Sequence, residues 1–236
     1  MSQKHFFPHR RGIIRERELG FMVPTHSDLI DILSETEGLS IVRKGEERTS
    51  TRFCGESYCG YPCFDYTLPK GYDEDCVSEI CALMILACKG GITVSADGHG
   101  VLSVCPPGSK ISTFRYLMKG GLRMGMKYGF GVLSRLTSYE KYCVDMMNRY
   151  IDGNTWYVAN LAVEPAYQGK GLAKRMLEPF LAYIDKIGSS VYLETHDGAN
   201  VPFYERFGFE LAEVGKLPDS DIKHYGMIRR VQSKPL

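Results

Sequence analysis

The sequence lacks a long hydrophobic segment and an excess of charge of either sign. Its longest apolar run, residues 80–88, is far shorter than the roughly 20 residues that a membrane-spanning helix needs. The basic N-terminus shows no apolar stretch followed by a cleavage site, so no secretory signal is expected. The 29 lysines and arginines nearly balance the 28 aspartates and glutamates, which gives no reason to expect a polyanionic partner. We therefore expect a cytoplasmic protein without membrane or nucleic-acid partners.

Two nucleotide-binding signatures are also absent. The chain contains no G-x-x-x-x-G-K-[ST] phosphate loop, and no glycine cluster has the spacing of a dinucleotide-binding fingerprint. Gly125, Gly129 and Gly131 lie inside a helical stretch, where they indicate close helix packing. The 236 residues suffice for one domain with an extension and a sizeable core.

Eight cysteines leave room for disulfides or a metal site. Cys54, Cys59 and Cys63 cluster, so a metal site is conceivable. Their spacing lacks paired C-x-x-C motifs, and no histidine is near them in sequence. We favour the other interpretation, reduced cysteines that act as small apolar residues in a cytosolic protein, and we expect no metal.

Hydrophobic periodicity indicates a mixed α/β protein. Helices are predicted at residues 27–33, from 46 onward, and at 75–88, 112–133, 138–151, 172–187 and 201–207. Strands are predicted at 38–43, 92–96, 101–105, 155–163, 190–195, 209–214 and 224–229. Proline and aromatic residues favour an ordered loop at 63–70. The unit spanning 155–195 should be a right-handed crossover between parallel strands.

The segment between the strand at 155–163 and the helix at 172–187 has the composition of an anion-binding loop. It contains Gly169, Lys170 and Gly171 directly before the helix. A helix N-terminus offers unpaired N–H groups, and glycine lets the backbone approach an anion closely. The segment therefore fits a pyrophosphate cradle, although an ordinary turn between a strand and a helix would explain the glycines alone.

The complete segment resembles a known family. Residues 168–173, Gln-Gly-Lys-Gly-Leu-Ala, match the [QR]-x-x-G-x-[GA] signature of the GCN5-related N-acetyltransferase superfamily, and Val-Glu-Pro at 163–165 matches its V-x-P. Residues 200–209, Asn-Val-Pro-Phe-Tyr-Glu-Arg-Phe-Gly-Phe, resemble its N-x-x-x-x-Y-x-x-x-G-F segment. The C-terminal half looks most similar to bacterial enzymes of the puromycin N-acetyltransferase type, at 155–158, 168–172, 192–195 and 202–206.

The resemblance implies a fold and a domain arrangement. Residues 1–37 would be an N-terminal extension and residues 38–236 the acyltransferase domain. The expected fold is a twisted, mostly antiparallel mixed sheet with a splayed central pair of parallel strands and helices on both faces.

The resemblance also implies a place for acetyl-CoA. In this superfamily the pantetheine arm lies where the strand before the phosphate loop splays from its neighbour. A backbone N–H in the strand, that of Val163, would polarise the acyl carbonyl, and Asn200 would touch pantetheine or orient a water. The residues implied to contact the cofactor are Leu161, Ala162, Val163, Gln168, Gly169, Lys170, Gly171, Leu172, Ala173, Lys174, Asn200, Phe203 and Tyr204.

Two catalytic residues are predicted. Tyr204 occupies the family's position for the acid that protonates the leaving thiolate. Glu194, at the end of its strand, is the leading candidate for the base, although a solvated strand-end carboxylate is the other interpretation. His196 and Asp197 are weaker candidates for the base. An acceptor pocket is expected from aromatic residues of the first half: Phe64, Tyr66, Phe114, Tyr116, Tyr128 and Phe130.

Three functions remain open. We favour transfer of an acetyl group from acetyl-CoA to a primary amine of a small molecule, by direct attack in a ternary complex. The second is acetylation of a peptide or protein, which a shallow, acidic, open groove would favour. The third is a non-catalytic acyl-CoA-binding module, against which the presence of Tyr204 argues. A homodimer is left open.

Overall fold

The computed structural model describes residues 26–109 and 116–231. Its helices are α1 (His26–Glu35), α2 (Glu47–Ser50), α3 (Cys54–Ser57), α4 (Pro62–Thr67), α5 (Glu74–Ala87), η1 (Leu117–Gly121), α7 (Leu122–Tyr128), α8 (Phe130–Met147), η2 (Pro165–Tyr167), α9 (Leu172–Ile187), η3 (Gly198–Asn200) and α10 (Val201–Glu205). Its strands are β1 (Leu39–Ile41), β2 (Ile92–Ala96), β3 (Gly100–Cys105), β4 (Thr155–Val163), β5 (Ser190–Thr195), β6 (Glu210–Lys216) and β7 (Lys223–Arg229).

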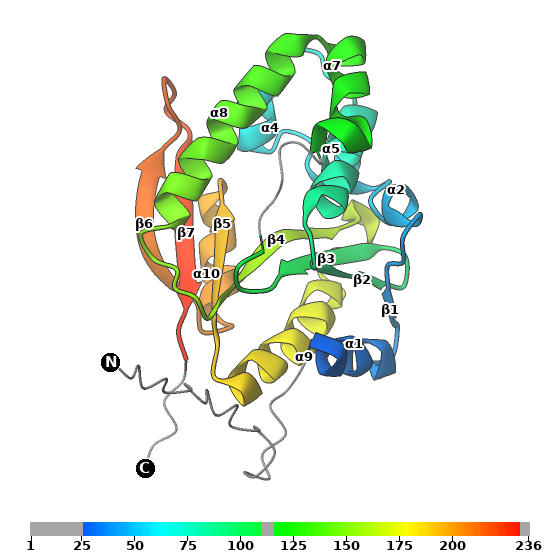
Figure 1. Ribbon diagram of the computed structural model, residues 1–236, viewed down its shortest axis with the longest axis vertical. Coiled ribbons are helices and arrows are strands. Elements are labelled where there is room, and N and C mark those ends of the chain that lie inside the picture. Colours follow the sequence, from blue (N-terminus) through cyan, green and yellow to red (C-terminus); the bar gives the residue numbers. More distant parts are fainter. Residues whose placement is uncertain (1–25, 110–115, 232–236) are drawn as a thin grey trace, which may run out of the picture.

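The seven strands form one sheet in the order β1-β2-β3-β4-β5-β7-β6. Only β4 and β5 run parallel, and the other neighbours are antiparallel. Helices α1 and α9 lie on one side of the sheet, while α5 and α8 lie on the other (Figure 1). The expected mixed sheet with a central parallel pair and helices on both faces is therefore confirmed.

The parallel strands separate soon after they meet. Their pairing covers only Thr155–Tyr157 of β4 against Ser190–Tyr192 of β5. On the opposite edge of β4, the register with β3 shifts between Ser103 and Val104, which marks a β-bulge. A bulge bends its strand and increases the local twist. From Val158 onward β4 has no pairing with β5, and this leaves a gap in the middle of the sheet.

Two buried clusters fill the two sides of the sheet. The first lies toward α1 and α9 and contains Trp156, whose ring meets Phe180 and Tyr183 of α9 edge-on. Leu29 and Leu33 of α1 belong to the same cluster, so α1 packs onto the domain although it precedes residue 38. The second cluster lies under α3, α4, α5, α7 and α8.

Two expectations for the first half are wrong. The segment 63–70 is not a loop throughout, because α4 occupies Pro62–Thr67. Proline suits the first turn of a helix, where its missing N–H is not needed. The helices expected at 112–133 and 138–151 are also placed differently. The boundary between α7 and α8 is at Gly129, whose φ of 92° is not helical. The start of the first expected helix lies outside the described residues.

The cysteines differ from the expectation in one respect. Cys88, after α5, forms a disulfide with Cys105 at the end of β3. The prediction that all the cysteines are reduced is therefore wrong for this pair. The remaining six are free, and five of them are buried as small apolar residues.

The longest helix in the described part of the chain is α8, with 18 residues. In Figure 1 it runs from α7 toward the side of the sheet that holds β6 and β7, and it carries charged residues along its length. Within residues 26–109 and 116–231, no helix combines the length and the apolar character that crossing a membrane requires.

Candidate active site

The predicted anion-binding loop has an open backbone at the start of α9. Gly169 and Gly171 have φ angles of 73° and 83°, in the left-handed region that glycine tolerates best. A Cβ atom added at either position would meet no atom within 4 Å. Gly171 is the N-cap of α9, whose dipole favours a negative charge at this end. The loop can therefore accept an anionic group against its backbone.

The β2–β3 turn holds this loop from one side. Nδ1 of His99 lies 2.5 Å from Oε2 of Glu164, and the N–H of Glu164 donates to the carbonyl of His99. The His99 ring also stacks on Tyr167, with 3.6 Å between centroids. The ammonium of Lys170 lies 4.6 Å from the Tyr167 ring centroid. Glu164 therefore has a structural role, because its contacts with His99 hold the loop against the β2–β3 turn.

Two tyrosines from the turn between α3 and α4 bridge the separating strands. The Tyr58 hydroxyl donates to Oδ1 of Asn160 and to the carbonyl of Leu161, both on β4. The Tyr61 hydroxyl lies 2.9 Å from Oγ1 of Thr195 on β5 and accepts from the backbone N–H that follows it. The two rings are 5.3 Å apart. These tyrosines therefore line the gap between β4 and β5, and the sequence interpretation missed both.

Tyr204 approaches the same gap from α10. It is buried, and its ring packs edge-on against Phe203 and Phe209. Burial, followed by the nearby Tyr61, raises the pKa of Tyr204, so its hydroxyl stays protonated at neutral pH. Asn200, just before α10, donates to Oγ1 of Thr195. The second family segment thus contributes a protonated hydroxyl beside the gap.

Glu194 lies at the vertex where β4 and β5 separate. Only 6% of its side chain is exposed, which excludes the interpretation of a solvated carboxylate. Oε2 accepts a hydrogen bond from Tyr157 of β4 at 3.2 Å. Oε1 is buried without a hydrogen-bond partner in the described part of the chain. A buried carboxylate with an unused oxygen is costly unless a ligand or water completes it.

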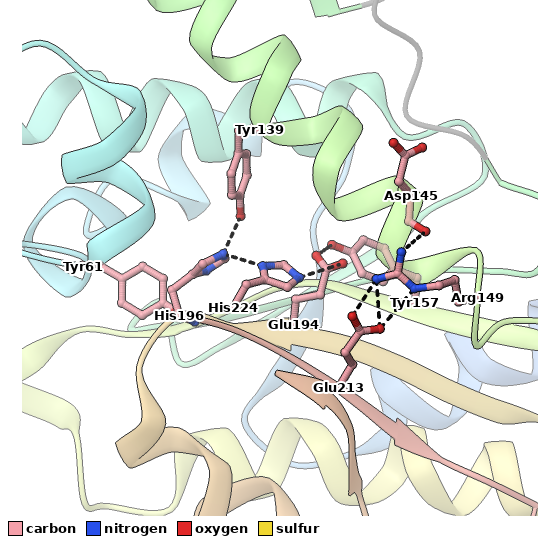
Figure 2. Close-up of polar contacts among 9 residues, drawn as sticks. All are labelled: Tyr61, Tyr139, Asp145, Arg149, Tyr157, Glu194, His196, Glu213 and His224. Atoms are coloured by element: carbon pink, nitrogen blue, oxygen red, sulfur yellow. Dashed lines mark hydrogen bonds and ion pairs between the residues drawn. The ribbon is translucent and has the colours of Figure 1, made fainter. Parts of the chain in front are cut away.

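A pair of histidines continues from Glu194 (Figure 2). Nε2 of His224 on β7 lies 3.6 Å from Oε1 of Glu194, and its Nδ1 lies 2.8 Å from Nε2 of His196. The Tyr139 hydroxyl of α8 lies 3.3 Å from the same nitrogen of His196. Burial and then His224 lower the pKa of His196 to about 3, so this imidazole is neutral. Carboxylate, imidazoles and phenol thus form one buried polar chain.

The two histidines and Cys143 of α8 carry ligand atoms suited to a metal. One atom each of Cys143, His196 and His224 lies within 4.8 Å of the others. Two nitrogens on a tetrahedral zinc would be about 3.3 Å apart, given zinc–nitrogen bonds of about 2.0–2.1 Å. The observed 2.8 Å is a hydrogen-bond distance instead. The Cys54, Cys59 and Cys63 cluster is not part of this group.

The aromatic residues expected in an acceptor pocket are dispersed. Phe64 is buried behind Tyr58 and Tyr61, with Tyr116 in the same cluster. Tyr128 packs against the same cluster and also borders a groove of about 520 Å³ between α2, α5 and α7, while Phe130 is exposed. The Tyr66 hydroxyl donates to the carbonyl of Pro218, and Phe114 lies outside the described residues. The tyrosines that contact Glu194 or His196 are instead Tyr157, which hydrogen-bonds Glu194, and Tyr61 and Tyr139, whose rings lie against His196.

Similarity to known proteins agrees with this geometry. Residues 129–211 match the family model described as the acetyltransferase (GNAT) domain. An uncharacterized N-acetyltransferase of Schizosaccharomyces pombe is 24% identical over 166 residues. Both matches support membership of the GCN5-related N-acetyltransferase (GNAT) superfamily. The aligned region makes up 66% of this chain and 66% of the yeast relative, just under two thirds of each.

Solved structures share the GNAT fold. An acetyltransferase from Corynebacterium glutamicum, titled histone acetyltransferase HPA2 and related acetyltransferase, is 15% identical and has a TM-score of 0.57, covering 84% of this chain and 98% of that one. A polyamine N-acetyltransferase of Drosophila melanogaster is 16% identical with a TM-score of 0.51, covering 82% and 100%. At these identities the likeness shows the fold alone. The expected family and fold are confirmed, and GNAT proteins belong to the class of acyl-transferring enzymes that the sequence predicts.

The GNAT motifs account for only half of the site. They predict the loop at 168–173, Asn200 and Tyr204, which the structure brings to the same end of β4 and β5. They carry no signal for His224, Tyr58 or Tyr61, which lie 28, 102 and 134 residues from their partners His196, Asn160 and Thr195. His196 is in this site, whereas Asp197 accepts from the N–H of Ala199 in η3.

Proposed function

We propose that this chain is an acetyl-CoA-dependent N-acetyltransferase that acetylates a primary amine of a small molecule by direct attack in a ternary complex. The buried Glu194 at the vertex of β4 and β5 is the observation that carries the proposal. It supplies an unpaired carboxylate oxygen where the two strands open, in a family whose members transfer acyl groups.

The open glycine loop supports the place proposed for acetyl-CoA. The pyrophosphate would lie against Gln168, Gly169 and Gly171, with Lys170 adding positive charge. Nε2 of Gln168 donates to the carbonyl of Val163, which fixes the loop to the end of β4. The pantetheine arm would then follow Leu161–Val163 into the gap. Lys174 is a lesser contributor, because its ammonium lies 3.6 Å from a carboxylate oxygen of Glu178.

The environment of Glu194 supports its role as general base. An amine reaches the site mostly as an ammonium ion at neutral pH and must lose a proton before it attacks. Tyr157 occupies Oε2 and leaves Oε1 free to receive that proton. Because the carboxylate is buried beside aromatic rings, its interaction with a cation is stronger than in water.

The state of Tyr204 supports its role as general acid. Attack on the thioester gives a tetrahedral intermediate, and its collapse expels the CoA thiolate. A thiol has a pKa of about 8.5 in water, so its departure is helped by a proton donor. The raised pKa of Tyr204 keeps that proton on the phenol until the thiolate forms.

Direct attack is favoured over a covalent acyl-enzyme. Cys63 and Cys143 are free cysteines whose pKa values are raised by burial and also by the Glu194 carboxylate. Burial raises the pKa of Cys63 to about 12 and also raises that of Cys143. The thiolate is the nucleophilic form of cysteine, so neither side chain is a ready acyl acceptor at neutral pH.

The cover over the site favours a small acceptor over a peptide. Helix α8 lies above Glu194, and Tyr61 lies on the side toward α4 (Figure 2). A peptide acceptor would need a shallow, acidic, open groove instead. The groove between α2, α5 and α7 is lined by Arg48, Arg52, Arg123 and Lys127 as well as two acidic residues, so it lacks that character. A non-catalytic binding module would need neither Tyr204 nor the buried Glu194.

An amine screen tests the proposal. The protein is incubated with acetyl-CoA and a panel of polyamines, arylalkylamines, amino sugars and N-terminal peptides, and release of free thiol is followed. We expect amine-dependent release with at least one small amine and its mono-acetylated product in the mass spectrum. Release with the peptides alone would favour protein acetylation, and binding of acetyl-CoA without any transfer would favour the binding module.

A further inference from the structure

His224 is placed between a carboxylate and a second imidazole. It lies on β7 with no exposed surface, and its ring faces Glu194 on one side and His196 on the other (Figure 2). Its Nδ1 is within hydrogen-bond distance of His196, whereas its Nε2 is 3.6 Å from Oε1 of Glu194. Both ring nitrogens of a buried histidine usually form hydrogen bonds, whereas in His224 only Nδ1 does so within the described part of the chain.

The two facing atoms lack partners. Nε2 of His224 and Oε1 of Glu194 are both buried without a hydrogen bond in the part of the chain that the structure describes. If His224 donates its Nδ1–H to His196, then Nε2 presents a lone pair toward the carboxylate. Two acceptors that face each other in a buried site provide a place for a proton between them. This tautomer of His224 can receive a proton delivered by Glu194.

The surrounding groups are neutral or already paired. Tyr157 of β4, Tyr192 of β5 and Tyr139 of α8 have pKa values that burial raises, so they stay protonated. Burial likewise raises the pKa values of the Cys63 and Cys143 thiols and of Tyr61, to about 12 in Cys63 and Tyr61. Tyr142 of α8 meets the His224 ring edge-on.

A second carboxylate lies further along β6. Glu213 accepts from Arg149 and Tyr150, and its pKa is lowered by these contacts. Its charge is therefore balanced by a guanidinium. In the described part of the chain Glu194 contacts Tyr157 and His224 and forms no ion pair with a lysine or arginine, so it is the carboxylate that can exchange a proton with the histidine pair.

We propose that His224 and His196 form a proton relay that removes from Glu194 the proton taken from the acceptor amine. The relay rests on the proposed function of Glu194 as the base. In the first step an N–H bond of the ammonium breaks and an O–H bond forms at Oε1. That O–H bond then breaks as an N–H bond forms at Nε2 of His224. The Nδ1 proton of His224 moves to Nε2 of His196, and His196 releases its Nδ1 proton to water. Both imidazoles then return to their starting tautomers before the next turnover.

The relay explains why a buried base can turn over. A proton left on Glu194 would block the next amine, because a neutral carboxylic acid cannot accept a second one. Burial of His196 favours its neutral form, so it does not retain the transferred proton. His224 and His196 are thus positioning and proton-transfer residues, and neither needs to touch the substrate.

Variants of His224 test the relay. His224→Gln places an amide near Nε2, and His224→Asn places one near Nδ1, so each keeps one hydrogen bond but cannot carry a proton through. We expect kcat at pH 6–7 to fall by about tenfold or more, with KM for acetyl-CoA unchanged. The loss should shrink at high pH, where free amine is abundant, and added imidazole should partly restore His224→Gly.

The matched control is Tyr142→Phe, which keeps the ring against His224 and removes no relay atom. If both His224 variants show the pH profile of Tyr142→Phe, the relay is wrong. Should the His224 variants fail to fold, His196→Gln must show the same low-pH loss, and a normal profile there also rejects the relay. Stoichiometric zinc in the purified wild-type protein, lost in Cys143→Ser, would reject it in favour of a metal site.

The relay and the proposed function fail in different ways. If the wild-type protein releases thiol with an amine and Glu194→Gln is impaired, a normal His224→Gln rejects only the relay. If the wild-type protein releases no thiol with any amine, the proposed function itself fails.

Discussion

Tyr157 on β4 donates a hydrogen bond to Oε2 of Glu194 on β5, across the point where the two strands separate. Tyr157 is the last residue of β4 paired with β5, and Glu194 lies two residues beyond the last paired residue of β5. Burial and then Glu194 raise the pKa of Tyr157, so the phenol remains a donor at neutral pH. The contact therefore fixes one carboxylate oxygen and leaves the other facing His224.

Gly171→Asp should abolish stabilisation by acetyl-CoA. The added carboxylate would stand where the pyrophosphate is expected, on a loop that has open space beside its backbone. A ligand at 100 times its Kd stabilises the native state by about 2.7 kcal/mol, which is visible as a rise in Tm. Gly188→Asp is the matched control, because Gly188 ends the same helix with a φ of 62° and open space around it. An equal Tm rise in both variants would contradict the loop assignment.

Glu194→Gln should reduce turnover most at low pH. The amide keeps the shape of the side chain but cannot take a proton from the ammonium. Because the fraction of free amine rises with pH, activity should partly recover toward pH 9. The comparison is with Glu210→Gln, an exposed position of β6. Parallel pH–rate profiles for the wild type and Glu194→Gln would mean that water or another group accepts the proton.

Tyr204→Phe should fold and bind acetyl-CoA but turn over slowly. The substitution removes only the hydroxyl and keeps the packing against Phe203 and Phe209. We expect a loss of roughly one to three orders of magnitude in kcat, in line with a general acid. The control is Tyr183→Phe, which removes a hydroxyl from the same core and should change kcat little. Normal turnover of Tyr204→Phe under conditions where chemistry limits the rate would remove Tyr204 from the mechanism.

His196 should make the protein sensitive to mild acid. Its native pKa of about 3 lies below the ordinary value of 6.5, so the unfolded chain binds this proton first as the pH falls. The contribution to stability is complete above pH 6.5 and is lost progressively toward pH 3. Between pH 7 and pH 5 the wild type should lose up to about 2 kcal/mol more than His196→Gln, at about 1.36 kcal/mol per pKa unit. Urea unfolding at both pH values measures this difference, and equal losses would contradict it.

The C-terminal half of the fold was predictable because its signals are local. The spacing of apolar residues gives α9, and the glycines before it lie at positions with positive φ. The strands β4 and β5 follow from their β-branched and aromatic residues. Tyr204 and Asn200 lie in a segment whose order of residues is itself the family motif.

The first half of the site was not predictable from local patterns. Tyr61 reaches Thr195 over 134 residues, and no periodicity in either segment records that contact. Proline and aromatic residues in 62–67 resemble a loop, yet the same proline starts α4. The helix boundary at Gly129 could not be predicted, because every glycine in this stretch weakens a helix. The packing of α7 against α8 decides at which glycine the helix ends.

The most direct test of direct attack at the β4–β5 vertex is a matrix of initial rates against acetyl-CoA and the best amine. A ternary complex predicts intersecting double-reciprocal lines, no thiol release without amine, and no acetylated enzyme in the mass spectrum. Parallel lines, together with a burst of thiol release before amine is added and an acetyl group on Cys63 or Cys143, would contradict the account.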